Sequence, residues 1–268
     1  MKSGTGDGKF DLLRQIYFKK NHGLEKEEAQ DKTLVNLILE QAKRVIAHPG
    51  KPTVHKLERF PVAPFSEIAL EETLEESPMI ERAAPEEILV ETILEKPFSC
   101  VTMLDSSSSM AGEKHLLASI AVAVLLLEIE SRNTSLVLFS SRSKVIKKMR
   151  SEESKEKTLL KFISSQPRGF TNIADGLEEG LKQCKIQRNQ RRKVGLLATD
   201  GRTTEGEDPL CIAKQFDFLA VLHLHGPGSS IEASRSIAQA GHGVCLEVER
   251  FEELPKKMYE AIRYLARQ

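Results

Sequence analysis

A chain of 268 residues, of which 40% are hydrophobic and 29% charged, has room for one large domain or for one domain with an additional arm. Lys and Arg balance Asp and Glu, and aromatic residues make up only 5%, which argues against nucleic-acid binding. We recognise no signal peptide, and the most apolar stretch, 116–129, is too short to span a bilayer. With four scattered cysteines and no Cys-x-x-Cys pair, these features predict a cytoplasmic protein without a membrane partner.

Residues 1–57 are expected to form an N-terminal helical segment. Apolar residues at helical spacing predict an amphipathic helix over 24–47, which His48-Pro49-Gly50 would end. A shorter helix is expected around residues 10–18. Because both helices would otherwise expose an apolar stripe, we expect them to pack against another part of the protein.

Residues 58–97 form an acidic, proline-containing connector. They carry 3 Lys or Arg against 11 Asp or Glu, and they include five prolines. The simplest interpretation is a solvated connector. It nevertheless contains too many Ile, Leu and Val residues for a fully disordered tract, so we expect parts of it to pack on the folded domain as extended or short helical pieces.

From residue 98 to residue 268, short apolar runs alternate with longer amphipathic stretches. We expect strands at 98–104, 134–139, 144–148, 193–199, 217–224 and 243–248. We expect helices at 112–130, 153–165, 173–187, 208–215, 230–240 and 252–267. This alternation predicts a doubly wound α/β domain, with a mostly parallel six-stranded sheet and helices on both faces. The second and third strands are close enough in sequence to form a hairpin, so one of them must be antiparallel.

Residues with carboxylate or hydroxyl side chains occur in three of the predicted loops. The first strand leads into Asp105, Ser107 and Ser109, Thr171 precedes the helix at 173, and Asp200 follows the strand at 193–199. The corresponding loops leave the carboxyl edge of the sheet, where ligands of such folds bind. Two carboxylates and three hydroxyls are hard oxygen ligands that suit Mg²⁺ or Mn²⁺ and leave a coordination position open for an anionic oxygen from outside.

This set resembles the metal-ion-dependent adhesion site (MIDAS) of von Willebrand factor A (VWA) domains, whose motif is Asp-x-Ser-x-Ser, then a Thr, then an Asp. The resemblance covers residues 98–268 and implies a Rossmann-like VWA domain. It also implies that the three hydroxyls touch the metal directly, while the two carboxylates act mostly through bound water.

One position departs from the family pattern. Ser108 stands where the family usually has Gly, and its Cβ is expected to stiffen or shift the first loop. The alternative to a metal site is that these segments have only structural roles, as a serine-rich helix cap and an ordinary Asp-Gly turn.

The strings Gly169–Leu177 and Thr199–Arg202 resemble the intracellular branch of the family, which includes the D subunit of magnesium chelatase and the partners of MoxR-type AAA+ ATPases. In that branch an acidic, proline-rich connector commonly precedes the metal-binding domain, as 58–97 does here. The resemblance therefore implies a MoxR-like AAA+ ATPase as the partner and an adaptor role for this chain.

The sequence thus predicts a non-catalytic binding module that presents a divalent metal to a Glu or Asp of a protein partner. One alternative is a metal-dependent hydrolase that uses the same sheet edge, although no base or nucleophile is placed beside the oxygen donors. Another is self-association, in which a glutamate of the acidic connector reaches the metal of its own chain or of a neighbour. His223 and His225 lie on one side of a predicted strand and, without a third ligand, indicate strand-end packing rather than a metal site.

Overall fold

The computed structural model describes residues 7–21, 28–46, 53–59, 67–68, 73–75, 88–95, 99–186 and 192–265. The chain divides into two compact units. Met1–Ala47 and Phe98–Leu265 form the larger unit, and His48–Pro97 with Ala266–Gln268 forms the smaller one. The larger unit contains the predicted α/β domain together with the N-terminal helices.

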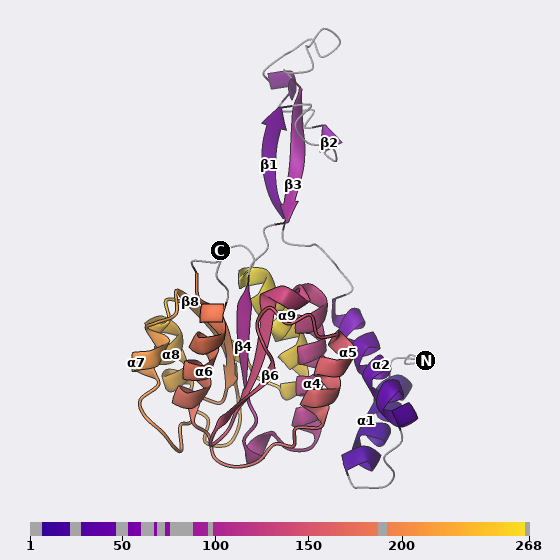
Figure 1. The fold of residues 1–268 in the computed structure, drawn as a ribbon, viewed down its shortest axis with the longest axis vertical. Coiled ribbons are helices and arrows are strands. Elements are labelled where there is room, and N and C mark those ends of the chain that lie inside the picture. The colour runs from indigo at the N-terminus through magenta and orange to yellow at the C-terminus, as the bar shows by residue number, and fades with distance from the viewer. Residues whose placement is uncertain are drawn as a thin grey trace. The chain divides into compact units, whose positions relative to one another are not determined.

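A six-stranded sheet runs through the larger unit (Figure 1). Its strands are β4 (Cys100–Asp105), β5 (Thr134–Phe139), β6 (Ser143–Lys147), β7 (Val194–Thr199), β8 (Phe218–Leu224) and β9 (Cys245–Val248). They lie in the order β6-β5-β4-β7-β8-β9, and only β6 is antiparallel to its neighbour. The predicted fold class, including the hairpin of β5 and β6, is confirmed.

The central strands are buried on both faces, which is why they read as continuous apolar runs rather than as alternating ones. In β4, Cys100 and Leu104 belong to the core on one face, whereas Val101 and Met103 belong to the core on the other. Successive side chains of a strand point to opposite faces, so a strand covered on both sides must be apolar throughout.

Helices cover both faces of this sheet (Figure 1). They are α4 (Glu113–Glu128), α5 (Lys155–Ile163), α6 (Ile173–Ile186), α7 (Leu210–Ala213), α8 (Ile231–Ala240) and α9 (Leu254–Leu265). Helices α4, α5 and α9 contribute to one core, and α6, α7 and α8 contribute to the other. Helix α4 is buried over most of its length, because neighbours surround it on every side. Among the described residues, no helix is both long enough and apolar enough to cross a membrane.

The N-terminal helices α1 (Asp7–Asn21) and α2 (Glu28–Val45) pack onto α4 and extend its core. Leu13 of α1 and Ile38 of α2 are fully buried there. The hydroxyl of Tyr17 hydrogen-bonds to Nδ1 of His115 in α4 at 2.6 Å, and the His115 ring stacks on Phe162 with centroids 4.7 Å apart. The apolar stripe of this arm is thus buried within the larger unit.

Replacing Tyr17 with Phe is expected to lower the free energy of unfolding by about 1–2 kcal/mol, because a buried ring nitrogen of His115 loses its partner. Urea denaturation at neutral pH measures this difference. The matched control is Tyr264→Phe. Because Tyr264 is 38% exposed, this substitution should change the free energy of unfolding by no more than about 0.5 kcal/mol. Equal effects of the two substitutions would contradict the assigned role of the Tyr17 hydroxyl.

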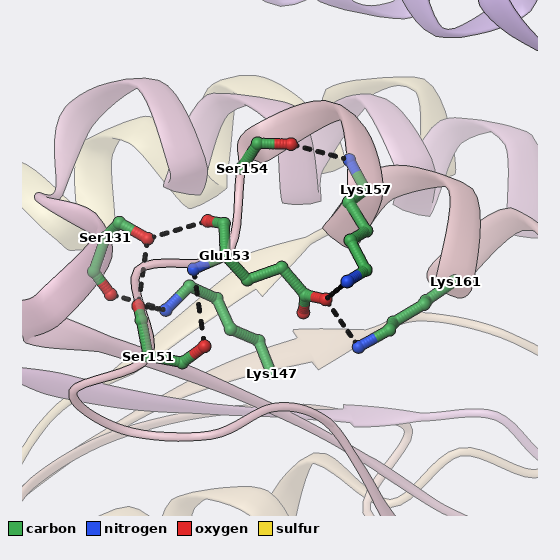
Figure 2. A network of polar contacts seen from close by, with 7 residues as sticks. All are labelled: Ser131, Lys147, Ser151, Glu153, Ser154, Lys157 and Lys161. Atoms are coloured by element: carbon green, nitrogen blue, oxygen red, sulfur yellow. Dashed lines mark hydrogen bonds and ion pairs between the residues drawn. The ribbon is translucent and has the colours of Figure 1, made fainter.

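A buried lysine joins the end of β6 to two loops (Figure 2). Lys147 is 1% exposed, and its Nζ donates hydrogen bonds to the carbonyl oxygens of Thr134 at 3.1 Å, of Ser151 at 2.9 Å, and of Ser131. Burial lowers the pKa of Lys147 to about 8, which still leaves the amine protonated at neutral pH. All three ammonium protons therefore have acceptors, as burial of a charge requires.

Lys147→Met is expected to cost about 2–4 kcal/mol of unfolding free energy, because three carbonyl groups lose a charged donor in a buried environment. The adjacent Lys148 is exposed and provides the control, Lys148→Met, which should be nearly neutral. Chemical denaturation of both variants checks the prediction. A stability of Lys147→Met equal to that of the control would show that the three contacts contribute nothing.

The smaller unit contains a three-stranded antiparallel sheet in the order β1-β3-β2. Its strands are β1 (Thr53–Arg59), β2 (Glu67–Ile68) and β3 (Leu89–Glu95), and Thr53 pairs with Glu95 at one end of the register. Thr73 is buried and bonds through its hydroxyl to both backbone groups of Leu89. Extended pieces were predicted within residues 58–97, but β1 begins at Thr53, in the segment expected to be helical, and the pairing of the strands was not predicted.

Candidate metal site

The loop after β4 holds the first three oxygen donors in a fixed arrangement. The Asp105 carboxylate is buried, and its Oδ1 accepts a hydrogen bond from the backbone N–H of Ser107 at 2.8 Å. The hydroxyl oxygens of Ser107 and Ser109 lie 3.1 Å apart and share a hydrogen bond. The Asp-x-Ser-x-Ser spacing therefore places the two hydroxyls next to each other, with the carboxylate anchored at the base of the same loop.

Ser108 ties this first loop to the second one. Both its backbone N–H and its hydroxyl donate to the carbonyl oxygen of Gly169, each at 3.2 Å, and the N–H of Arg168 donates to the carbonyl of Ser106 at 2.9 Å. The Ser108 side chain is exposed, and its φ is not among the positive values of the described non-glycine residues. This backbone does not require a glycine, and the hydroxyl adds a link between the two loops.

The second loop is in turn joined to the third. Thr171 is buried, and its carbonyl oxygen accepts hydrogen bonds from the N–H groups of Thr204 at 2.9 Å and Glu205 at 3.2 Å. The Thr171 N–H donates to the hydroxyl of Thr204 at 2.9 Å. All three loops are consequently cross-linked by hydrogen bonds at the carboxyl edge of the sheet.

Asp200 begins the third loop, where β7 has ended. Its Oδ1 accepts from the N–H of Arg202 at 2.9 Å, and its carbonyl accepts from the N–H of Ser230 at 2.9 Å. The next residue, Gly201, has a φ of 78°, and a Cβ there would lie 2.2 Å from the carbonyl oxygen of Ser230. Only glycine at position 201 therefore allows the chain to turn in this way directly after Asp200.

The structure brings Asp105, Ser109 and Asp200 together around one pocket of about 60 Å³. Ser107 adjoins this group through its contact with Ser109. Thr171 lies on the neighbouring loop and is not among the residues that line the pocket. The rest of the lining consists of Met110, Lys114, Leu224, His225, Gly226, Pro227 and Phe251.

Electrostatics at this pocket favour a bound cation. The pKa of Asp105 is raised to about 6, chiefly by burial and to a smaller extent by the negative charge of Asp200, against the opposing effects of the hydrogen bonds from Ser107 and the charge of Lys114. Two carboxylates close together in a partly dry site repel each other. A divalent cation between them would relieve both the repulsion and the cost of burying the charge.

The donor geometry fits a small divalent ion. Adjacent ligands of an octahedral ion with metal–oxygen distances of about 2.1 Å lie about 3 Å apart, and the Ser107 and Ser109 hydroxyls are separated by 3.1 Å. Within the described part of the chain, no group of three or more His, Cys, Asp or Glu residues could hold a metal ion. The candidate donor set is thus made of oxygen atoms, with hydroxyls completing two carboxylates.

The other residues of the pocket wall were not predicted as part of the site from the sequence, and they include Lys114, His225 and Phe251. Lys114 comes from the start of α4, and its amine lies 5.7 Å from the ring centroid of Phe251. His225 follows β8 and bonds to Glu247, whereas His223 is buried and bonds to Ser234 at 2.8 Å. The position of His225 could have been inferred from the sequence, because the loop after β8 must leave the same sheet edge as the three predicted loops.

Comparison with known proteins now assigns the family. The sequence profile of the von Willebrand factor type A domain matches residues 100–256. The chain belongs to this family. A search of curated proteins finds no match to this VWA protein.

Solved structures with the same fold include proteins of very different settings. A mussel byssus protein, proximal thread matrix protein 1 with a zinc-occupied MIDAS motif, is 20% identical, with a TM-score of 0.54 over 65% of this chain and 48% of the other. BatB from Bacteroides thetaiotaomicron is 17% identical, with a TM-score of 0.52 over 64% and 100%. An aerotolerance-related membrane protein from Bacteroides fragilis is 17% identical, with a TM-score of 0.50 over 62% and 99%. At these identities the likeness shows the VWA fold alone.

Proposed function

We propose that this VWA domain is a protein-interaction module that binds Mg²⁺, or Mn²⁺, and through it a carboxylate of a protein partner. The proposed ligands are Asp105, Ser107, Ser109, Thr171 and Asp200. The observation that carries the proposal is the convergence of Asp105, Ser109 and Asp200 on one small pocket, with the Ser107 hydroxyl next to that of Ser109. The zinc-occupied MIDAS of the mussel protein, which shares the fold, supports it.

The chain's own residues would prepare the site in three ways. Ser107, Ser109 and Thr171 would supply neutral oxygens, which leave the ion electrophilic. Asp105 and Asp200 would balance its charge without filling every coordination position. When bound, the ion supplies a Lewis-acidic position that a carboxylate from outside can occupy.

The dimensions of the pocket favour a side chain as its ligand. Sites for small-molecule substrates usually enclose about 300–1,000 Å³, whereas this pocket holds about 60 Å³. Phe170, next to Thr171, is 67% exposed and offers an aromatic contact surface beside the site. We therefore favour the binding of a partner's Glu or Asp over turnover of a substrate, and we regard the chain as non-catalytic.

For the partner, we propose a MoxR-like AAA+ ATPase, with this chain acting as its adaptor in a chelatase-type complex. The support is the resemblance of residues 169–177 and 199–202 to the intracellular branch of the family. We also propose that the protein works in the cytoplasm, because its four cysteines are all free thiols.

Two measurements test these proposals in turn. Calorimetric titration of Mg²⁺ into EDTA-treated protein should show one binding site, and no detectable binding of Mg²⁺ or Mn²⁺ would overturn the metal assignment.

Affinity capture from the native organism should recover an AAA+ ATPase in Mg²⁺ and lose it in EDTA. Recovery of other proteins in Mg²⁺, with no ATPase among them, would leave the metal site standing and remove the ATPase assignment.

A further inference from the structure

A second and much larger cavity, of about 670 Å³, lies next to the first metal loop. Its walls come from the first loop, from the turn between β5 and β6 with the start of β6, and from the segment after α5. The lining residues are Ser106, Leu138, Ser140, Ser141, Arg142, Ser143, Lys144, Ser164, Ser165, Gln166, Arg168 and Gly169. Hydroxyl and cationic side chains dominate this set.

The lining of the cavity has a local excess of positive charge. Arg142, Lys144 and Arg168 all line it and are exposed, and its lining includes no Asp or Glu. None of these three cations forms an ion pair with any residue that the structure describes. The carboxylate of Asp175 accepts a hydrogen bond from the backbone N–H of Ser143 in this wall, so one negative charge lies beside the three positive ones. A concave surface with unpaired cations and hydroxyl donors is suited to anionic groups.

This cavity and the candidate metal site are formed in part by the same two loops, although no residue lines both pockets. Ser106, which lines the cavity, lies in sequence between the site residues Asp105 and Ser107. On the second loop, Gly169 lines the cavity, and the N–H of the next residue, Phe170, donates to the hydroxyl of Ser141 at 3.1 Å. The two sites therefore adjoin along the first and second loops, which allows one extended ligand to reach both.

We infer that the cavity of Arg142, Lys144 and Arg168 is a second binding site for the same partner, which receives further acidic side chains of the peptide segment whose carboxylate reaches the metal. This inference rests on the proposed function and specifies the partner's chemistry: an acidic segment, rather than an isolated Glu or Asp. The cations would hold the flanking carboxylates, and the serine hydroxyls would donate hydrogen bonds to them.

The lining favours an acidic peptide over a nucleic acid. Proteins that bind single strands combine positive charge with aromatic side chains on which bases stack. No aromatic residue occurs among those that line this cavity. Its charge is also confined to one concavity, whereas the whole chain has a net charge of zero.

The test uses the full-length protein and a hexaglutamate peptide as the probe, titrated calorimetrically in Mg²⁺. The variant Arg142→Gln/Lys144→Gln/Arg168→Gln should bind the peptide at least about tenfold more weakly, because it lacks all three cations. It should keep the wild-type Mg²⁺ affinity and melting temperature. The matched control is Lys148→Gln/Lys185→Gln/Lys214→Gln, which removes the same charge from exposed positions away from the cavity and should bind hexaglutamate like the wild type.

Four results would overturn the inference. They are the absence of hexaglutamate binding to the wild type, an equal affinity of the cavity variant and the wild type, binding that persists unchanged in EDTA, and tighter binding of oligothymidylate through the same three residues. The proposed function has a separate readout, because it fails if the wild type binds no Mg²⁺ in the titration without peptide. If Mg²⁺ binds but the cavity variant keeps its peptide affinity, the metal site stands and only the second site is lost.

Discussion

Asp105→Asn and Asp200→Asn are each expected to weaken Mg²⁺ binding by at least about a hundredfold. Each substitution removes one of the two negative charges that would balance the ion, and carboxylates around a metal contribute strongly to its affinity even when they act through water. Asn keeps an oxygen that can accept the hydrogen bonds from the N–H groups of Ser107 and Arg202, so the loops should retain their conformation. Calorimetry measures the affinity, and the rise of melting temperature with Mg²⁺ gives a second readout.

The matched control for this prediction is Asp208→Asn. Asp208 is exposed, lies outside the pocket lining, and accepts a hydrogen bond from the N–H of Leu210 at 3.0 Å. Its variant should bind Mg²⁺ like the wild type. Unchanged Mg²⁺ affinity in both Asp105→Asn and Asp200→Asn would show that the ion binds elsewhere.

Ile38→Ala is expected to destabilise the protein by about 3–4 kcal/mol, in the range of buried Ile or Leu truncations. Ile38 of α2 is fully buried in the core that α2 shares with α4. Its truncation therefore leaves a buried cavity that solvent cannot fill. Urea denaturation of the EDTA-treated protein measures the change without a contribution from bound metal.

Leu12→Ala is the control for this arm of the protein. Leu12 lies on α1 but is 47% exposed, so its truncation should cost no more than about 0.5–1 kcal/mol. If Ile38→Ala were as mild as Leu12→Ala, the N-terminal helices would be accessory to the VWA core rather than part of it.

The α/β domain could be predicted from the sequence because its signals are local. Each buried strand is an apolar run of suitable length, and each intervening helix has its own periodicity. The separation between Phe139 and Ser143 also required a hairpin. The convergence of the loops of Asp105 and Asp200 at one edge then followed from the parallel arrangement, because β4 and β7 are neighbours in the sheet.

Other features depend on pairings that no local pattern reveals. The amphipathic stripe of α2 indicated burial, but α4 is apolar nearly all around, so its sequence did not show which face would receive the arm. The sheet of β1 and β3 joins Thr53 to Glu95 across a long acidic segment, and neither strand alone specifies its partner. The participation of Lys114 and His225 in the pocket depends on side-chain positions, which strand order does not determine.

The position of α1 and α2 has a consequence for the order of events during synthesis. These helices are made before their partner α4, and the same core is completed by α9, which is made after all six strands. At about 5–20 residues per second, the ribosome needs on the order of ten seconds or more between α2 and α9. Throughout that interval the apolar surface of the nascent arm has no finished core to join, and exposed apolar surface of this kind favours aggregation.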